Sequence, residues 1–153
     1  VHNNGATLDI AQVQLEVGNT ATEFEHRSYG EELELCQRYY YSIYRRGSSS
    51  EGNLSIGGVG SLYTNSAVYI DLLFPTQMRA SPTLIVASGT NRFQVCPTTC
   101  ISFGNPTLIH AHKNAATLTA TLTSSNTAGR VGNVFMQTGN WSEGEQLAFM
   151  AEL

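Results

Sequence analysis

The most regular pattern in the chain is the run TLTATLT at residues 117–123, in which a threonine alternates with an apolar residue. Successive side chains of a β-strand point to opposite faces of a sheet. The run therefore predicts a strand with Leu118, Ala120 and Leu122 facing a core and the threonines facing solvent. This alternation constrains the region to a β-sheet with one buried face.

Segment 66–74 alternates in the same way before Pro75 ends it, and its opposite face carries Tyr69 and Asp71. Its predicted inner face consists of Val68, Ile70, Leu72 and Phe74. Other short strands separated by turn residues are predicted at 39–45, 54–63, 84–87, 93–95, 100–103, 108–112, 131–137 and 146–153. Glycines within 54–63 predict a bulge or a close backbone approach. The pattern predicts an all-β fold, a jelly-roll-like β-sandwich.

A different spacing precedes the strands. Leu33, Cys36 and Tyr40 recur at helical intervals, and three glutamates (31, 32 and 34) come before Arg38, as the helix dipole favours. We expect one short helix within 29–38. The chain then divides into three parts: residues 1–18 as the terminal strand of a preceding, mostly absent domain, 19–38 as a connector with the helix, and 39–153 as the sandwich.

The connector region resembles a joint in phage tail fibres, tailspikes and related prophage-encoded surface proteins. There, a carbohydrate-binding-like jelly roll is linked to a β-rich tip. The matching residues are Gln14, Leu15, Glu16, Gly18, Ala21, Thr22, Phe24, Glu25, Arg27, 29–33 and 36–40, with 74–83 and 148–153 further along the chain. Glu23 stands where the family usually has proline, and 89–125 matches no pattern of the family. The resemblance implies a homotrimer, located in a virion tail fibre or on a bacterial surface.

The composition argues against two classes of partner. Only 13% of the 153 residues are charged, the net charge is −4 and the pI is near 5.5. An acidic chain gives no electrostatic reason to bind nucleic acid or an anionic membrane. No apolar run approaches the roughly 18 residues of a membrane-spanning helix, so we expect no membrane insertion.

The three cysteines are expected to be structural. Cys36 falls on the helical pattern and is expected to be a buried thiol. Cys96 and Cys100 could close a small disulfide loop or stay as free thiols on neighbouring strands, and the reducing cytosol in which phage proteins fold agrees with free thiols. A C-x3-C pair alone is a weak metal signal, because zinc needs about four ligands.

No catalytic pattern is present, so we expect a protein that is not an enzyme and that needs no cofactor. The carboxylates after the helix have no partner at a recognisable spacing, and phosphate-loop and dinucleotide motifs are absent. His110 and His112 would share one face of a strand, and three such pairs on a threefold axis could hold a metal ion. Two ordinary surface or interface histidines are the better interpretation.

Binding residues are sought among aromatic and planar polar side chains beside turn signals. Trp141 and Asn140 lie in the turn-rich run TGNWSEG, where a buried indole is hard to arrange. Asn91, Arg92 and Tyr63 also adjoin turns. Aromatic faces stack on sugar rings, while amides and guanidinium groups bind hydroxyls, so these five residues are the candidate ligand-binding set. The competing interpretation gives each an ordinary role, with Trp141 capping the edge of the core.

Several predicted strands carry apolar residues on both faces, at 72–73, 84–86 and 147–150. A lone sandwich needs one buried face per strand, so a further covering surface is expected, and the homotrimer would supply it. A thicker core is the alternative. Two functions fit: a distal receptor-binding and trimerisation domain that attaches to a bacterial surface glycan or protein, or a purely structural module with recognition in the upstream domain.

Overall fold

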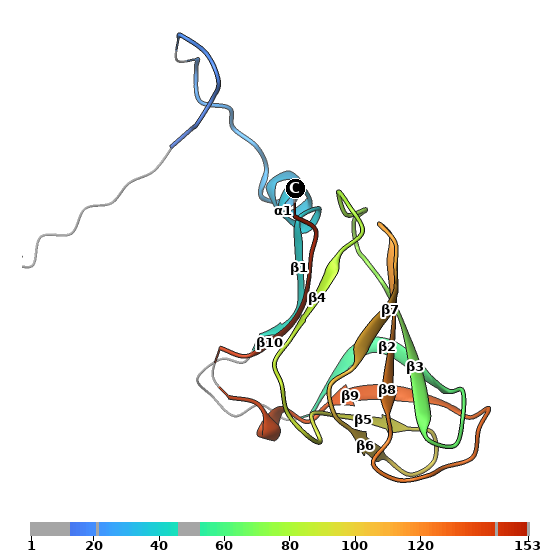
Figure 1. Cartoon of the computed structure of the whole chain (residues 1–153). Coiled ribbons are helices and arrows are strands. Elements are labelled where there is room, and N and C mark those ends of the chain that lie inside the picture. The colour runs from blue at the N-terminus through green and yellow to red at the C-terminus, as the bar shows by residue number, and fades with distance from the viewer. Residues whose placement is uncertain (1–12, 21, 46–52, 143, 153) are drawn as a thin grey trace, which may run out of the picture.

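The structure, a computed structural model, describes residues 13–20, 22–45, 53–142 and 144–152. One helix is followed by a series of short strands (Figure 1). The elements are α1 (Tyr29–Gln37), β1 (Tyr40–Arg45), β2 (Leu54–Leu62), β3 (Ala67–Leu73), β4 (Thr83–Val86), β5 (Phe93–Cys96), β6 (Ile101–Phe103), β7 (Thr107–Ala111), β8 (Ala115–Thr121), β9 (Val131–Met136), the 3-10 helix η1 (Thr138–Asn140) and β10 (Gln146–Met150).

The strands form two antiparallel sheets, one in the order β1-β10-β4 and one in the order β6-β5-β9-β2-β3-β8-β7. The pairing is nested: β1 pairs with β10, β2 with β9 and β3 with β8, while β5 pairs with β6. Strand pairs wound around each other in this way characterise jelly rolls. The predicted all-β sandwich is confirmed.

The core lies between the sheets, and the alternating segments supply it as predicted. Leu118, Ala120 and Leu122 are buried, and so are Val68, Ile70 and Leu72 from β3. Aromatic rings close the space between the sheets, because Phe74 contacts Phe149 of β10 edge to face at 4.9 Å between ring centroids. The period-2 pattern thus placed the buried face of both strands correctly.

Strand β2 contains the irregularity that its glycines predict. Its register with β9 shifts between Ser55 and Val59, and Gly57 within the shift has a φ of 72°. Only glycine adopts that conformation without strain, so the bulge is specified locally.

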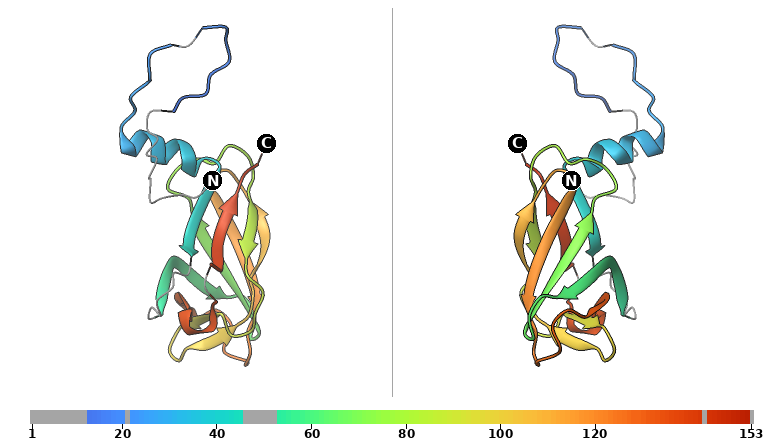
Figure 2. Two further views of the ribbon diagram at one scale, coloured as in Figure 1. Left: turned by 90° about the vertical axis from the view of Figure 1, so that its left-hand side faces the viewer. Right: turned by 90° about the vertical axis from the view of Figure 1, so that its right-hand side faces the viewer.

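The helix occurs where it was expected. Ser28 and Glu31 form a capping box, in which the Ser28 side chain accepts from the Glu31 amide and the Glu31 side chain accepts from the Ser28 amide. No residue of the helix is buried, however. The expectation that Cys36 is a buried thiol is therefore wrong: it is exposed, because the helix projects from the sandwich and no core element covers it (Figure 2).

The N-terminal segment departs from expectation as well. Of the predicted terminal strand 1–18, residues 1–12 lie outside the described residues, and 13–18 form no strand. Residues 13–20 and 22–28 instead form an arm that extends away from the sandwich beyond α1 (Figure 1).

The two remaining cysteines are bonded. Cys96 at the end of β5 and Cys100 before β6 form a disulfide, with their Cα atoms 4.0 Å apart. The β5–β6 pairing brings the ends of the loop together, and this proximity decides between the two alternatives that the sequence leaves open.

Two of the strands predicted to carry apolar residues on both faces, β3 and β10, differ in how well the single chain buries these residues. Leu147, Ala148 and Phe149 of β10 are fully buried within the single chain, so this segment needs no partner to cover it. Leu73 is 82% exposed beside the buried Leu72. An apolar side chain thus remains exposed on β3, whereas the single chain covers Leu147, Ala148 and Phe149 of β10.

Candidate binding site

Four of the five predicted ligand-binding residues lie together. Asn91 and Arg92 end the β4–β5 loop, and Asn140 and Trp141 lie in the β9–β10 connection. The loops meet because β5 pairs with β9, with Phe93 opposite Met136. Both lie at the end of the molecule opposite α1 (Figures 1 and 2).

Arg92 is held from several sides although it lies in a loop. Its guanidinium group makes a bidentate ion pair with Glu145, and its Nη2 also donates to the Ser88 carbonyl oxygen at 2.8 Å. The group lies over the Trp141 ring, 5.0 Å from the centroid. Arg92 is only 7% exposed, so this charge is already matched by Glu145 and is not available as a free cation for a ligand.

Trp141 is buried, with 4% of its surface exposed, which corrects the expectation of an exposed indole. Its Nε1 donates to the Arg92 carbonyl oxygen at 3.3 Å, and its ring packs edge to face against Phe93 and Tyr44 at 5.6 Å from each centroid. A buried indole needs an acceptor for its N–H, and the neighbouring loop supplies one. Trp141 therefore packs beneath Arg92 and helps to hold it in place, and its buried ring cannot stack on a sugar in this structure.

The backbone of the β4–β5 loop fits closely around Arg92. A Cβ atom at Gly89 would lie 2.0 Å from Arg92 Nε, so a side chain there would displace the guanidinium group. Asn91 has a φ of 52°, a conformation in which asparagine is enriched among non-glycine residues. Glycine at 89 thus leaves room for the Arg92 guanidinium group, and the φ at position 91 favours asparagine or glycine.

Above this support lies a surface hollow of about 370 Å³, lined by Gly89, Thr90, Asn91, Arg92 and Asn140. Asn140 Nδ2 donates to the Asn91 carbonyl oxygen at 2.6 Å and to Gln137 Oε1 at 2.9 Å. With both amide hydrogens used, Asn140 Oδ1 is the group that can accept from a ligand. The lining thus offers amide and hydroxyl groups around a neutralised arginine, which suits hydrogen bonds to an uncharged polar molecule.

Tyr63, the fifth predicted binding residue, is not among the residues that line this hollow. It is 68% exposed and stacks in parallel on Tyr69, with 4.9 Å between ring centroids and 6° between ring planes. Tyr69 pairs with Ser61 across β2 and β3. The exposed Tyr63 ring stacks on the half-buried Tyr69 ring, and neither lines the hollow, so the aromatic and amide parts of the predicted set do not form one site.

Two carboxylates for which the sequence shows no partner are engaged by other side chains in the structure. Glu145 is engaged by Arg92, and Asp71 Oδ1 accepts from the Thr117 hydroxyl at 2.7 Å. Among the described residues there is no group of three or more His, Cys, Asp or Glu side chains that could hold a metal ion. His110 lies in β7, whose register shifts between Leu108 and His110, and His112 lies just beyond the end of this strand at Ala111.

Sequence reasoning missed Gly89, Thr90, Glu145 and Tyr69 as parts of these surfaces. The alternation of β3 already turned Tyr69 outward, so its pairing with Tyr63 could have been suspected. Glu145 had no sequence signal, because its partner Arg92 is 53 residues away.

No protein-family model, curated protein or solved structure matches the chain. In the part of the chain that the structure describes, no helix has the length and apolar character needed to cross a bilayer.

Proposed function

We propose that the chain is the distal receptor-binding and trimerisation domain of a fibre, which attaches to a bacterial surface glycan or protein. The observation that carries the proposal is the amide-lined hollow over the fixed Arg92–Trp141 pair. The two loops that line this hollow lie at the end opposite the N-terminal arm, where a fibre tip would meet its target (Figure 1). The resemblance of residues 14–40 to phage fibre joints supports the same function, in a virion tail fibre or on a bacterial surface.

The chemistry of the hollow favours a saccharide. Sugar hydroxyl and acetamido groups both donate and accept hydrogen bonds, and asparagine amides match both roles. Asn140 is already oriented by Asn91 and Gln137, so little conformational freedom is lost when a ligand binds. The stacked Tyr63–Tyr69 pair offers a second, aromatic contact surface for a longer glycan.

Binding of the purified chain to an array of bacterial surface glycans tests the proposal. Asn91→Gly removes the side chain and keeps the backbone free of strain at a φ of 52°. Asn140→Ala removes the bridge between the loops. Each variant should weaken binding at least about tenfold, in the range for loss of a central polar contact. Asn133→Ala, at an exposed position on β9, is the matched control and should bind like the wild type.

A purely structural module that trimerises the fibre is the second candidate. The observation in its favour is α1, none of whose residues is buried, together with the exposed arm. Trimeric chains that bind no glycan and no bacterial surface would support this candidate over attachment.

A further inference from the structure

The N-terminal part of the chain that the structure describes is rich in acidic residues. Residues 13–20 and 22–37, here called the acidic arm, contain six glutamates (16, 23, 25, 31, 32 and 34) against one basic residue that is always charged, Arg27. Arg27 pairs with Glu25 at 2.6 Å and more weakly with Glu32 at 3.5 Å. The remaining glutamates leave the acidic arm with a large excess of negative charge.

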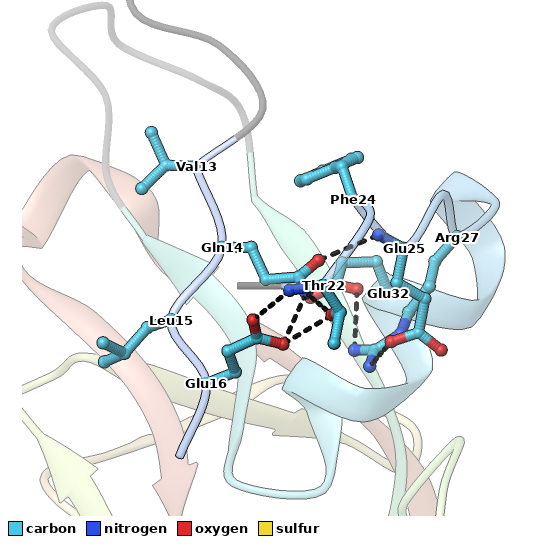
Figure 3. A pocket seen from close by; sticks show the side chains of 9 residues that line it. All are labelled: Val13, Gln14, Leu15, Glu16, Thr22, Phe24, Glu25, Arg27 and Glu32. Atoms are coloured by element: carbon cyan, nitrogen blue, oxygen red, sulfur yellow. Dashed lines mark hydrogen bonds and ion pairs between the residues drawn. The ribbon is translucent and has the colours of Figure 1, made fainter. Parts of the chain in front are cut away.

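The polar side of the acidic arm is organised internally. Glu16 accepts from the Thr22 amide and hydroxyl, both at 2.6 Å, and Gln14 Oε1 accepts from the Glu25 amide at 2.8 Å. Figure 3 shows these polar side chains gathered between the segment that carries Gln14 and Glu16 and the segment that carries Thr22 and Glu25. Val13 and Leu15 point away from them. Val13, Leu15 and Val17 are between 75% and 108% exposed. The arm thus has a fixed polar interior and an uncovered apolar face.

Helix α1 also lacks cover. It has nine residues, none of them buried, and Leu33 and Leu35 are 41% and 37% exposed. Isolated helices of this length are marginal in water even with good caps, and most helical stability comes from packing. The described part of the chain provides no such packing, so a contact from outside the chain is expected.

The α1 end of the sandwich has the opposite charge. Main-chain hydrogen bonds bring three segments together there: the Arg79 amide donates to the Arg38 carbonyl oxygen at 2.8 Å, and the Met78 amide donates to the Lys113 carbonyl oxygen at 2.8 Å. We call Arg38, Arg79, Lys113, His110 and His112 the basic end. All five are exposed, and none pairs with a carboxylate among the described residues. One acidic residue, Glu152, follows Ala151, whose amide donates to the carbonyl oxygen of Tyr39 next to Arg38.

We propose that the acidic arm of one copy docks on the basic end of a second copy of this chain. This rests on the proposed assembly of identical chains and specifies the contact. Both complementary surfaces occur on one chain, and the same contact would cover the exposed apolar side chains of the acidic arm, those of α1 included. Because the two surfaces differ, the contact is heterologous. Such contacts close into a ring of three copies, as in a homotrimer, when each copy is rotated by one third of a turn relative to its neighbour.

Charge reversal in the full chain, read by sedimentation equilibrium, tests the contact. Glu32→Lys/Glu34→Lys reverses the charge at two positions of α1 and changes the formal charge of the acidic arm from −5 to −1, without touching Glu31 of the capping box. Arg79→Glu/Lys113→Glu reverses the basic end without removing the main-chain bonds. Each double variant should weaken association at least about tenfold, and rising salt should weaken the wild-type assembly. The variant with all four substitutions again sets opposite charges against each other at these four positions, so it should associate more tightly than either double variant.

The control is Arg130→Glu, which reverses an exposed charge on the β8–β9 connection and should leave the mass unchanged. Circular dichroism of each variant verifies the sandwich. An oligomer indifferent to both reversals, or a four-substitution variant that stays dissociated, would overturn the proposed contact while leaving glycan attachment intact. A monomeric wild type would overturn the contact and the assembly together.

Discussion

The Arg92–Glu145 pair gives the most quantitative prediction about the site. The side chains are 8% and 24% exposed, so the pair is largely shielded from water on the arginine side and partly open on the glutamate side. Glu145→Ala leaves the guanidinium group with the Ser88 carbonyl and the Trp141 ring as its partners. Removing one partner of a fully buried pair costs about 3–5 kcal/mol. The partial exposure of Glu145 lowers the expected loss of unfolding free energy to about 2–3 kcal/mol.

Urea denaturation measures this loss, and the midpoint of thermal unfolding should fall by roughly 5–10 °C. Glu152→Ala, at an exposed glutamate, is the control and should change stability by less than about 0.5 kcal/mol. Arg92→Met/Glu145→Ala removes both charges, and its loss should be smaller than the sum of the two single losses by at least about 1 kcal/mol. A Glu145→Ala protein as stable as the wild type, or strictly additive variants, would refute the assigned role of the pair.

Three further outcomes follow from the structure. Trp141→Ala should cost about 3–5 kcal/mol of unfolding free energy, because the ring is buried against Phe93 and Tyr44; a stable variant that has lost only ligand affinity would contradict that burial. Cys96→Ser/Cys100→Ser should cost about 2 kcal/mol, the value for a short cross-linked loop, and an unchanged urea midpoint would argue against the bond. The pKa of Glu16 lies below its ordinary value because the Thr22 hydroxyl and amide donate to its carboxylate. The arm contacts are therefore stabilising above the unfolded-state pKa and lost as the pH falls through the folded pKa. An NMR titration should show a Glu16 midpoint below that of an ordinary glutamate, moving upward in Thr22→Val; equal midpoints would count against the contact.

Local patterns predicted the fold well because they report on backbone geometry. The alternation at 117–123 marked the inner face of β8, the glycines of β2 marked its bulge, and the spacing around Leu33 marked α1. Each of these features depends on residues close in sequence. The boundaries also followed from turn residues such as Pro75.

The errors arose where distant segments meet. Trp141 was expected in solvent because its neighbours form turns, yet the β5–β9 pairing brings the Arg92 carbonyl to its N–H. Cys36 lies on a helical pattern that indicates a buried face, but the chain itself provides nothing to bury it. The disulfide required the 4.0 Å approach of two Cα atoms, which spacing alone could not establish. For the candidate site, the sequence predicted Asn91, Arg92 and Asn140. It did not predict that the Asn91 and Asn140 side chains are exposed, whereas Arg92 is buried and holds the loops in place.

The most direct test of the attachment function is to map, by NMR, where a saccharide selected from the glycan array binds the full chain. The account predicts chemical-shift changes at the amides of Thr90 and Asn91 and at the Asn140 side chain, with Trp141 Nε1 moving less because it is buried beneath the hollow. Saccharide binding that leaves these signals unchanged, and shifts residues of the acidic arm or the α1 end instead, would contradict the proposed site.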